Sequence, residues 1–259
     1  MQASVDPKTP LLTHLIELRR RILMCFALFI CVFAIAYYFS DTIYVFLQQP
    51  LIAAFDDPSQ RRMIYTGLHE AFFTYLKLAF FTATLVSMPM FLIQIWRFIA
   101  PGMYSHEKRN ISPLFISTPI LFYAGAALAF YVVMPLAWDF FIGFENNQSK
   151  GVAVELEARI SEYLGIVIQL TLAFGLCFEL PVLLMVLAKA GIVTPESLRR
   201  YRRHAIVGVF LCAALLTPPD LISQIALGLP IILLYELSIL LIHWQTNASA
   251  IAPKSSPSQ

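Results

Sequence analysis

Long stretches without a charged residue constrain this chain more than any other feature of its sequence. Four of them are charge-free (22–40, 78–96, 110–138 and 204–219), and two more (163–188 and 221–253) each contain one carboxylate. A helix that spans a bilayer needs about 20 apolar residues. Only 13% of the residues are charged, whereas soluble domains have about 25%. We therefore predict an all-α polytopic membrane protein whose solvent is the bilayer.

The boundaries of the apolar stretches predict six membrane-spanning helices in one domain, residues 1–244. We expect the helices at about 22–43, 71–97, 110–137, 162–188, 204–217 and 222–243. The last two could instead form a single re-entrant hairpin. We favour two short spanning helices, because the sequence Thr217-Pro218-Pro219-Asp220 is a strong turn signal. Residues 245–259 are rich in Ser, Pro, Ala and Asn, which predicts a disordered tail.

The distribution of basic residues predicts the orientation of these helices. With the N-terminus inside, the cytoplasmic segments hold most of the Lys and Arg residues, as the positive-inside rule requires. The outer segments hold only Arg61, Arg62, Lys150 and Arg159, together with many carboxylates. Both termini, and hence the tail, are therefore expected in the cytoplasm.

Several function classes find no support in the sequence. The four cysteines lie inside apolar stretches and form no C-x-x-C pair, so no metal site is expected. Phosphate-binding loops and the common hydrolase motifs are missing from the sequence. The net charge of +2 gives no reason to expect a nucleic acid partner. We therefore predict a protein that is not an enzyme and carries no cofactor.

Two carboxylates stand out against the basic background of the predicted cytoplasmic side. Glu17 precedes Arg19, Arg20 and Arg21, and Glu107 lies between the second and third apolar stretches. Glu17 could simply pair with an arginine of its own helix. Glu107 has no basic residue four positions further on. Because a guanidinium matches a carboxylate with two parallel hydrogen bonds, the pair suits a ligand that carries two arginines.

Polar groups inside or next to the apolar stretches form a second set of candidates. Glu179, followed by Pro181, lies near the middle of the fourth stretch, where a carboxylate must face a cavity, a polar partner or a proton. A hydrogen bond to Gln94 is the structural alternative to a functional role. Asp220 and Gln224 flank the predicted outer turn, either as turn caps or as a contact for another membrane helix.

Five short motifs, in this order, resemble the TatC family, the receptor subunits of the twin-arginine protein translocase. The matching stretches are His14–Arg21, Trp96–Tyr104, His106-Glu107, Phe178–Pro181 and Leu216–Asp220 with Gln224. The resemblance covers about residues 8–244. It implies six helices in a curved, glove-like arrangement in the bacterial inner membrane.

The resemblance also implies roles for individual residues. Signal peptides with paired arginines would bind at Glu17 and Glu107, in a region that includes Arg19 and Phe98. Thr217 and Gln224 match a site where small single-span subunits of the TatA and TatB types bind, although Ala214 departs from the Met of some relatives. Pro50 matches a position in the first outer loop, and Glu179 an intramembrane carboxylate of the concave face.

The function implied is the transport of folded proteins, driven by the proton-motive force, by a complex in which several copies self-associate. A proton-coupled secondary transporter that uses Glu179 is the alternative, and a membrane scaffold is a third hypothesis. A transporter of that kind is expected to show an internal repeat, and we detect none in the sequence. A scaffold would have no use for Glu17 and Glu107 on a basic background.

Overall fold

The structure is a computed structural model that describes residues 9–55, 61–99, 112–145, 156–216 and 221–251. Nearly all of these residues are helical, and the extended pairing among them is limited to one bridge between Ile64 and Arg159. The all-α prediction is therefore confirmed. In chain order the elements are α1 (Thr9–Tyr38), α2 (Ser40–Ala54), α3 (Glu70–Ile99), α4 (Ser112–Leu128), the π-helical turn η4 (Ala129–Val133), α5 (Met134–Ile142), α6 (Ile160–Cys177), α7 (Leu180–Lys189), α8 (Pro195–Arg200), α9 (Arg202–Leu216) and α10 (Leu221–Ile251).

Five helical segments of the described chain are long and apolar enough to cross a membrane. They are Ile16–Tyr38, Glu70–Arg97, Ile116–Ile142, Ile160–Lys189 and Ser223–Trp244. They overlap five of the six predicted spans. The sixth, α9, has 15 residues, and at about 1.5 Å per residue it reaches ~22 Å, less than a hydrocarbon core of ~30 Å. It is a short helix, as the sequence predicted.

Two of the long spans are broken in the middle, and a proline lies next to each break. Pro135 is the second residue of α5, which follows the π-helical turn directly. Pro181 is the second residue of α7, which is separated from the end of α6 by two residues, Phe178 and Glu179. Proline lacks the backbone N–H that would continue the helical hydrogen bonds, so the chain bends at these points. Glu179 lies in the second break, where it is the residue that precedes α7.

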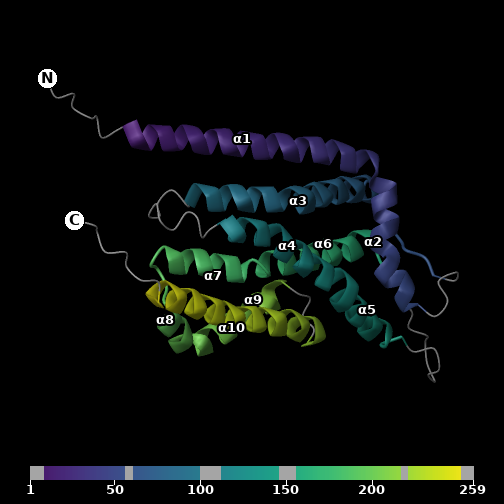
Figure 1. The fold of residues 1–259 in the computed structure, drawn as a ribbon. Helices are drawn as coiled ribbons and strands as arrows, with labels where there is room; N and C mark the ends of the chain where they lie inside the picture. The colour runs from purple at the N-terminus through teal and green to yellow at the C-terminus, as the bar shows by residue number, and fades with distance from the viewer. Residues whose placement is uncertain (1–8, 56–60, 100–111, 146–155, 217–220, 252–259) are drawn as a thin grey trace, which may run out of the picture.

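The helices define two ends of the molecule (Figure 1). The starts of α1 and α4 and the ends of α3, α7 and α10 lie at one end, together with α8. We call this the basic end, because it carries many basic residues: Arg19, Arg20, Arg21, Arg97, Lys189, Arg199, Arg200, Arg202 and Arg203. At the opposite end, α2 lies across the bundle beside α5, near the starts of α3 and α6. We call it the clasp end, for the ion pairs described below.

Three features differ from the prediction. The first span ends at Tyr38 rather than near residue 43, since the chain turns at Phe39 and continues as α2. Pro50, expected in a loop, is a buried residue inside α2. Residues 245–251, expected to be disordered, continue α10, and Pro253 lies two residues beyond its end at Ile251. The rest of the predicted tail, 252–259, lies outside the described residues.

The packing between α4 and α6 forms the centre of the molecule. A Cβ atom at Gly125 of α4 would lie 2.5 Å from the carbonyl oxygen of Phe174, and one at Gly175 of α6 would lie 2.8 Å from the ring of Phe122. Both phenylalanines are completely buried. The two glycines therefore allow a close approach of the helices that no larger residue would permit. This contact joins α4, which starts at the basic end, to α6, which starts at the clasp end.

Candidate functional site

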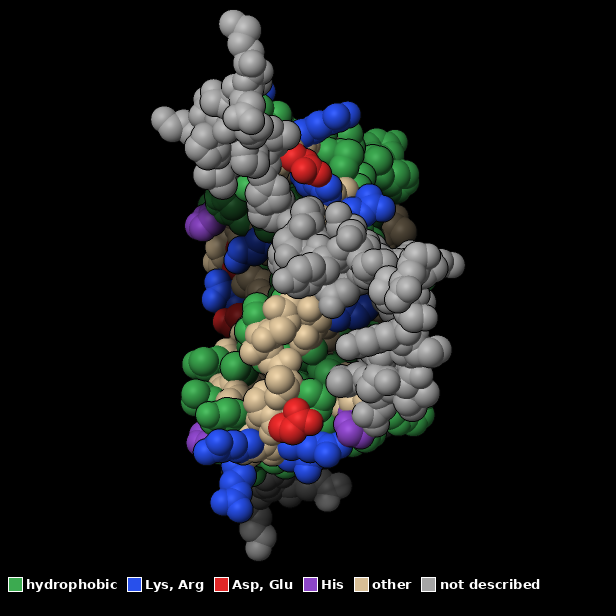
Figure 2. Space-filling view, turned by 60° about the vertical axis from the view of Figure 1, so that its left-hand side comes forward, with side chains coloured by type: hydrophobic (Ala, Val, Ile, Leu, Met, Phe, Trp, Pro, Cys, Tyr) green, Lys and Arg blue, Asp and Glu red, His purple; other side chains and the backbone are tan. Residues whose placement is uncertain are grey.

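Basic side chains gather at the basic end, with a few acidic side chains among them (Figure 2). Two ion pairs lie at or near this end. Glu17 of α1 binds Arg21 at 2.5 Å, and Arg202 of α9 binds Glu236 of α10 at 2.6 Å. All four side chains are partly or largely exposed to solvent. The basic end therefore presents carboxylates within a surplus of positive charge.

Glu17 is part of a hydrogen-bonded chain that joins α1 to α3. Arg21 donates to Glu17 Oε1 from Nε at 3.1 Å and from Nη2 at 2.5 Å. Its third donor, Nη1, bonds to Oε1 of Gln94 at 2.8 Å. Gln94 lies near the end of α3 and is buried. The pairing of Glu17 with an arginine of its own helix, one of the two alternatives for this residue, is thus present.

Two of the other residues expected at the signal-peptide site, Arg19 and Phe98, lie on the same two helices. Arg19 is an exposed residue of α1. Phe98 lies in the last turn of α3, where the structure describes its backbone but not its side chain. Glu107 also lies outside the described residues. The segment that carries it joins the end of α3 to the start of α4, and both of these lie at the basic end (Figure 1).

Glu179 lies in the interior of the bundle. Its side chain is buried, and among the described residues no donor meets either carboxylate oxygen with full hydrogen-bond geometry, although the hydroxyl of the fully buried Thr118 on α4 interacts with it. The structural alternative, a hydrogen bond between Glu179 and Gln94, is wrong, because Gln94 bonds to Arg21 instead. A buried carboxylate without a full set of partners is costly in a membrane. A functional role for Glu179 therefore stays a prediction.

The expected partner-helix site is only partly described. Gln224 of α10 donates from Nε2 to the backbone oxygen of Phe210 on α9 at 3.2 Å. The two helices approach closely here, since a Cβ atom at Gly228 would lie 2.9 Å from the ring of Phe210. Thr217 and Asp220 lie outside the described residues. The outer faces of both helices carry exposed leucine, isoleucine and valine side chains.

The clasp end contains a carboxylate network that the sequence analysis missed. Glu70, at the start of α3, is buried and accepts Arg159 Nε at 2.9 Å and Nη2 at 3.0 Å, one on each oxygen. It also accepts the Ser161 hydroxyl at 2.6 Å and the backbone N–H groups of Thr66 and Gly67 at 2.9 and 3.1 Å. Next to it, Ile64 pairs with the backbone on both sides of Arg159.

A second ion pair completes this end. Arg61 donates from Nη1 and Nη2 to the two oxygens of Glu145 at 2.7 and 2.5 Å, and the backbone N–H of Leu156 donates to the same carboxylate at 2.8 Å. The hydrogen bonds from Arg61 hold the pKa of the Glu145 carboxyl below its usual range. We call the two bidentate pairs, Glu70–Arg159 and Glu145–Arg61, the clasp. It joins the segments before α3, after α5 and before α6.

Charge composition contained a weak signal for the clasp. The sequence assigns both acidic and basic residues to the outer segments, which is typical of ion pairs, but the pairs are separated by 84 and 89 positions. No sequence spacing relates such positions, so only the fold shows which carboxylate binds which arginine.

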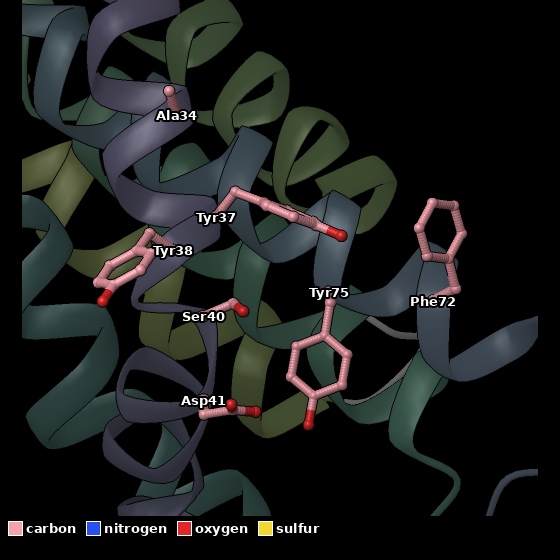
Figure 3. A pocket seen from close by; sticks show the side chains of 7 residues that line it. All are labelled: Ala34, Tyr37, Tyr38, Ser40, Asp41, Phe72 and Tyr75. Carbon is pink, nitrogen blue, oxygen red and sulfur yellow. The ribbon is translucent and has the colours of Figure 1, made fainter.

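A hollow of about 550 Å³ lies at the bend between α1 and α2 (Figure 3). Tyr37, Ser40 and Asp41 border it on one side, and Phe72 and Tyr75 of α3 border it on the other. None of the site residues expected from the sequence lines this hollow. Among the described residues, no group of acidic, His and Cys side chains is arranged to hold a metal.

Fold and site together define a polytopic membrane protein with a basic end on which an exposed carboxylate binds a guanidinium. The family model of the Sec-independent protein translocase protein TatC matches residues 13–230. TatC of Rickettsia prowazekii is 48% identical over 89% of this chain and 91% of its own length, and TatC of Escherichia coli K12 is 42% identical over 91% and 89%. The chain belongs to the TatC family.

A solved structure agrees with this assignment. The crystal structure of the twin-arginine translocase receptor TatC in the detergent DDM superposes with a TM-score of 0.75 at 35% identity, over 88% of this chain and 99% of that one. The resemblance inferred from the five motifs is thus confirmed, and so is the polytopic membrane fold. The chain is a component of the Sec-independent translocase, a protein-transport machinery.

Proposed function

We propose that this chain is the signal-peptide receptor and core subunit of a twin-arginine translocase. Its ligand is the paired-arginine signal peptide of a folded protein, and its binding site is the basic end, with Glu17 and Glu107 as the two carboxylates. The observation that carries the proposal is the state of Glu17. Its carboxylate is half exposed and already accepts two hydrogen bonds from a guanidinium, that of Arg21.

The chemistry of this end supports a ligand with arginines. A guanidinium has a planar set of N–H donors that matches a carboxylate, whereas the ammonium of lysine is a point charge. The surplus of basic residues around Glu17 repels cations that do not reach a carboxylate directly. Arg19, on the exposed surface of α1, and Phe98, in the last turn of α3, contribute to the surface on which the peptide lies.

Transport requires partners and an energy source. We infer that small single-span subunits of the TatA and TatB types bind along α9 and α10, near Gln224, Thr217 and Asp220. Exposed apolar side chains on both helices and the polar Gln224 support this site.

Copies of the chain associate in the complex, in a bacterial inner membrane with the basic end in the cytoplasm. The proton-motive force drives the movement of cargo, and a protonophore that leaves export unchanged would contradict this.

The partner site has its own test. The variant Gln224→Leu removes the polar group and keeps the apolar surface. We expect the single-span subunits to copurify less well with it than with the unchanged chain, and copurification at the same level would contradict the site.

A proton-coupled transporter that uses Glu179, the alternative function, is not supported by membership in a family of protein-transport subunits.

The receptor function is tested by peptide binding. The full chain in lipid nanodiscs is titrated with a fluorescent peptide that has adjacent arginines followed by an apolar segment. We expect Glu17→Gln to weaken binding about tenfold, because a hydrogen bond to a charged group contributes about 1.5–3 kcal/mol. The double variant Glu17→Gln, Glu107→Gln should weaken it about a hundredfold.

The matched control is Glu196→Gln. Glu196 is an exposed carboxylate of α8 at the same end, so its loss changes the charge equally but should leave the affinity within about twofold. A peptide with lysines in place of both arginines should bind about tenfold more weakly. Unchanged binding to the double variant would contradict the receptor function.

A further inference from the structure

The hollow at the bend between α1 and α2 lies where two membrane-spanning segments end. The span in α1 ends at Tyr38, and the span in α3 begins at Glu70. Tyr37 and Tyr38 border the hollow on one side, and Phe72 and Tyr75 border it on the other. Because α1 and α3 pack along each other, we place the hollow at the level where the hydrocarbon core of the bilayer meets the lipid headgroups.

The lining of the hollow combines aromatic rings with a carboxylate. Four of its seven lining residues are aromatic, and Asp41 is the one charged residue among the described residues that line it. Ser40 and Asp41 point toward Tyr75 (Figure 3). Aromatic faces and a carboxylate both attract a cation, whereas a carboxylate repels a ligand that carries only negative charge. The lining therefore favours a ligand with a positive group.

Asp41 differs from other carboxylates near the clasp end. Four of these pair with an arginine: Glu70, Glu145, Glu157 and Glu162. No ion pair between described residues includes Asp41. Its side chain is exposed in the first turn of α2, where a negative charge also stabilises the helix dipole. That role explains the charge, and an interfacial aromatic belt would explain the rings. A site for a cation explains why both occur in one hollow.

The position of the hollow indicates where such a cation comes from. At the headgroup level of a membrane, phosphatidylethanolamine carries an ammonium that a short chain links to a phosphate. The ammonium offers N–H donors that a carboxylate accepts, and the hydroxyls of Tyr37 and Ser40 can donate to the phosphate. The volume of the hollow, about 550 Å³, lies within the roughly 300–1,000 Å³ of small-molecule sites. Phosphatidylglycerol has the same phosphate but no cation, so Asp41 would repel it.

We propose that the hollow is a binding site for the headgroup of phosphatidylethanolamine. The ammonium lies at the carboxylate of Asp41, beside the rings of Tyr37 and Tyr75, and the acyl chains lie along the exposed apolar faces of α1 and α3. The hollow lies at the opposite end of α1 from Glu17. The lipid site is therefore separate from the proposed peptide site, and each can be tested without the other.

The test compares two lipids that differ only in their headgroups. The full chain in detergent is titrated with phosphatidylethanolamine and with phosphatidylglycerol, each carrying the same fluorophore on one acyl chain. We expect the ethanolamine lipid to bind about tenfold more tightly, because only its ammonium bonds to Asp41. Asp41→Asn should weaken its binding about tenfold and leave that of phosphatidylglycerol within about twofold. Tyr37→Leu, which removes one ring, should weaken the binding of phosphatidylethanolamine about threefold.

The matched control is Asp139→Asn. Asp139 is an exposed carboxylate of α5 near the clasp end that does not line the hollow. Its loss changes the net charge equally, so the preference for phosphatidylethanolamine should stay within about twofold of that of the unchanged chain. A thermal melt shows whether each variant is folded, and Tyr37→Leu provides the answer if Asp41→Asn is not.

Two results would overturn the lipid site directly: equal affinities of the unchanged chain for the two lipids, or a preference that Asp41→Asn retains. Phosphoethanolamine without acyl chains distinguishes a lipid from a soluble amine as the source of the ammonium. We expect it to displace the labelled lipid only at concentrations about a hundredfold higher than unlabelled phosphatidylethanolamine requires, because it has no apolar chains to bury. Displacement at equal concentrations would assign the hollow to a soluble amine instead.

Discussion

The two ends of the molecule use the same side chains in opposite ways. At the clasp end, Glu70 and Glu145 each bind an arginine through both oxygens and also accept backbone N–H groups. At the basic end, Glu17 binds Arg21 through one oxygen and remains half exposed.

The difference separates ion pairs that stabilise the fold from an ion pair whose carboxylate is accessible to a ligand. In the clasp, both oxygens of each carboxylate are bonded to a guanidinium, and backbone N–H groups occupy further lone pairs. Such a carboxylate cannot accept hydrogen bonds from a ligand. The clasp carboxylates are 8% exposed, whereas that of Glu17 is 46% exposed. An exposed pair contributes little to stability, so it can exchange its partner at little cost. Sites for visiting arginines are therefore expected where the carboxylate of an ion pair is exposed.

The largest expected effect comes from the packing that connects the two ends. Gly125→Ala places a Cβ atom 2.5 Å from the carbonyl oxygen of Phe174, and such overpacking costs about 1–3 kcal/mol. Peptide binding at the basic end and thermal stability should both decrease. Gly165→Ala is the control, since nothing lies within 4 Å of that Cβ position, and it should be neutral or stabilising by up to about 1 kcal/mol. Equal melting temperatures of the two variants would show that α4 and α6 are less tightly joined.

The next effect separates the ends. Glu70→Gln removes the charge that Arg159 pairs with and keeps the shape of the side chain. We expect a fall of several degrees in the melting temperature, because one guanidinium and two backbone N–H groups lose their charged acceptor. Glu157→Gln, which alters the largely exposed pair with Arg62, should change it by less than about one degree. Peptide affinity of the folded protein should stay the same in both, and a loss of affinity in Glu70→Gln would break the separation between the ends.

The pH dependence of the clasp gives a third, smaller effect. Because Arg61 lowers the pKa of Glu145 in the folded protein, the ionised carboxyl stabilises the fold at pH values above its unfolded pKa of about 4.3. That contribution is lost as the pH falls through the lower, folded pKa. The melting temperature of the unchanged chain should therefore exceed that of Glu145→Gln by a constant amount from pH 8 to about 5. The gap should then close in stronger acid, and a gap that widens on acidification would contradict the pairing.

The smallest effect is expected from the exposed pair near the basic end. Glu236→Gln removes the partner of Arg202, but both side chains are more than a third exposed. The free energy of unfolding should change by only about 0.5 kcal/mol, measurable by reversible denaturation in detergent. A loss as large as that caused by Glu70→Gln would mean that pairs at this end are structural as well.

Much of the fold could be predicted from local sequence. Five of the six expected spans are found as long helices, and the short α9 matches the short fifth stretch. The errors fall where tertiary contacts override local preferences. Pro50 was expected in a loop, but α2 is tied to α6 by the Tyr163 hydroxyl, which donates to the carbonyl of Leu47 at 2.6 Å.

The candidate site was predictable only where it depends on local sequence. Glu17 stands out by its charge, and its pairing with Arg21 follows from helical spacing. The third member of that link, Gln94, lies 73 positions away, and the sequence analysis considered it only as an alternative partner for Glu179. Its actual partner depends on how α1 packs against α3.

By itself, the sequence determined that this protein lives in a membrane, where its helices lie along the chain, and which family it resembles. These properties follow from apolar stretches and short motifs, and both are local. The tertiary structure decided which carboxylates are buried in ion pairs and which stay exposed, because the buried pairs form between side chains that are distant in sequence and meet only through helix packing. Burial then determines how firmly each pair holds, and burial is a property of the whole fold.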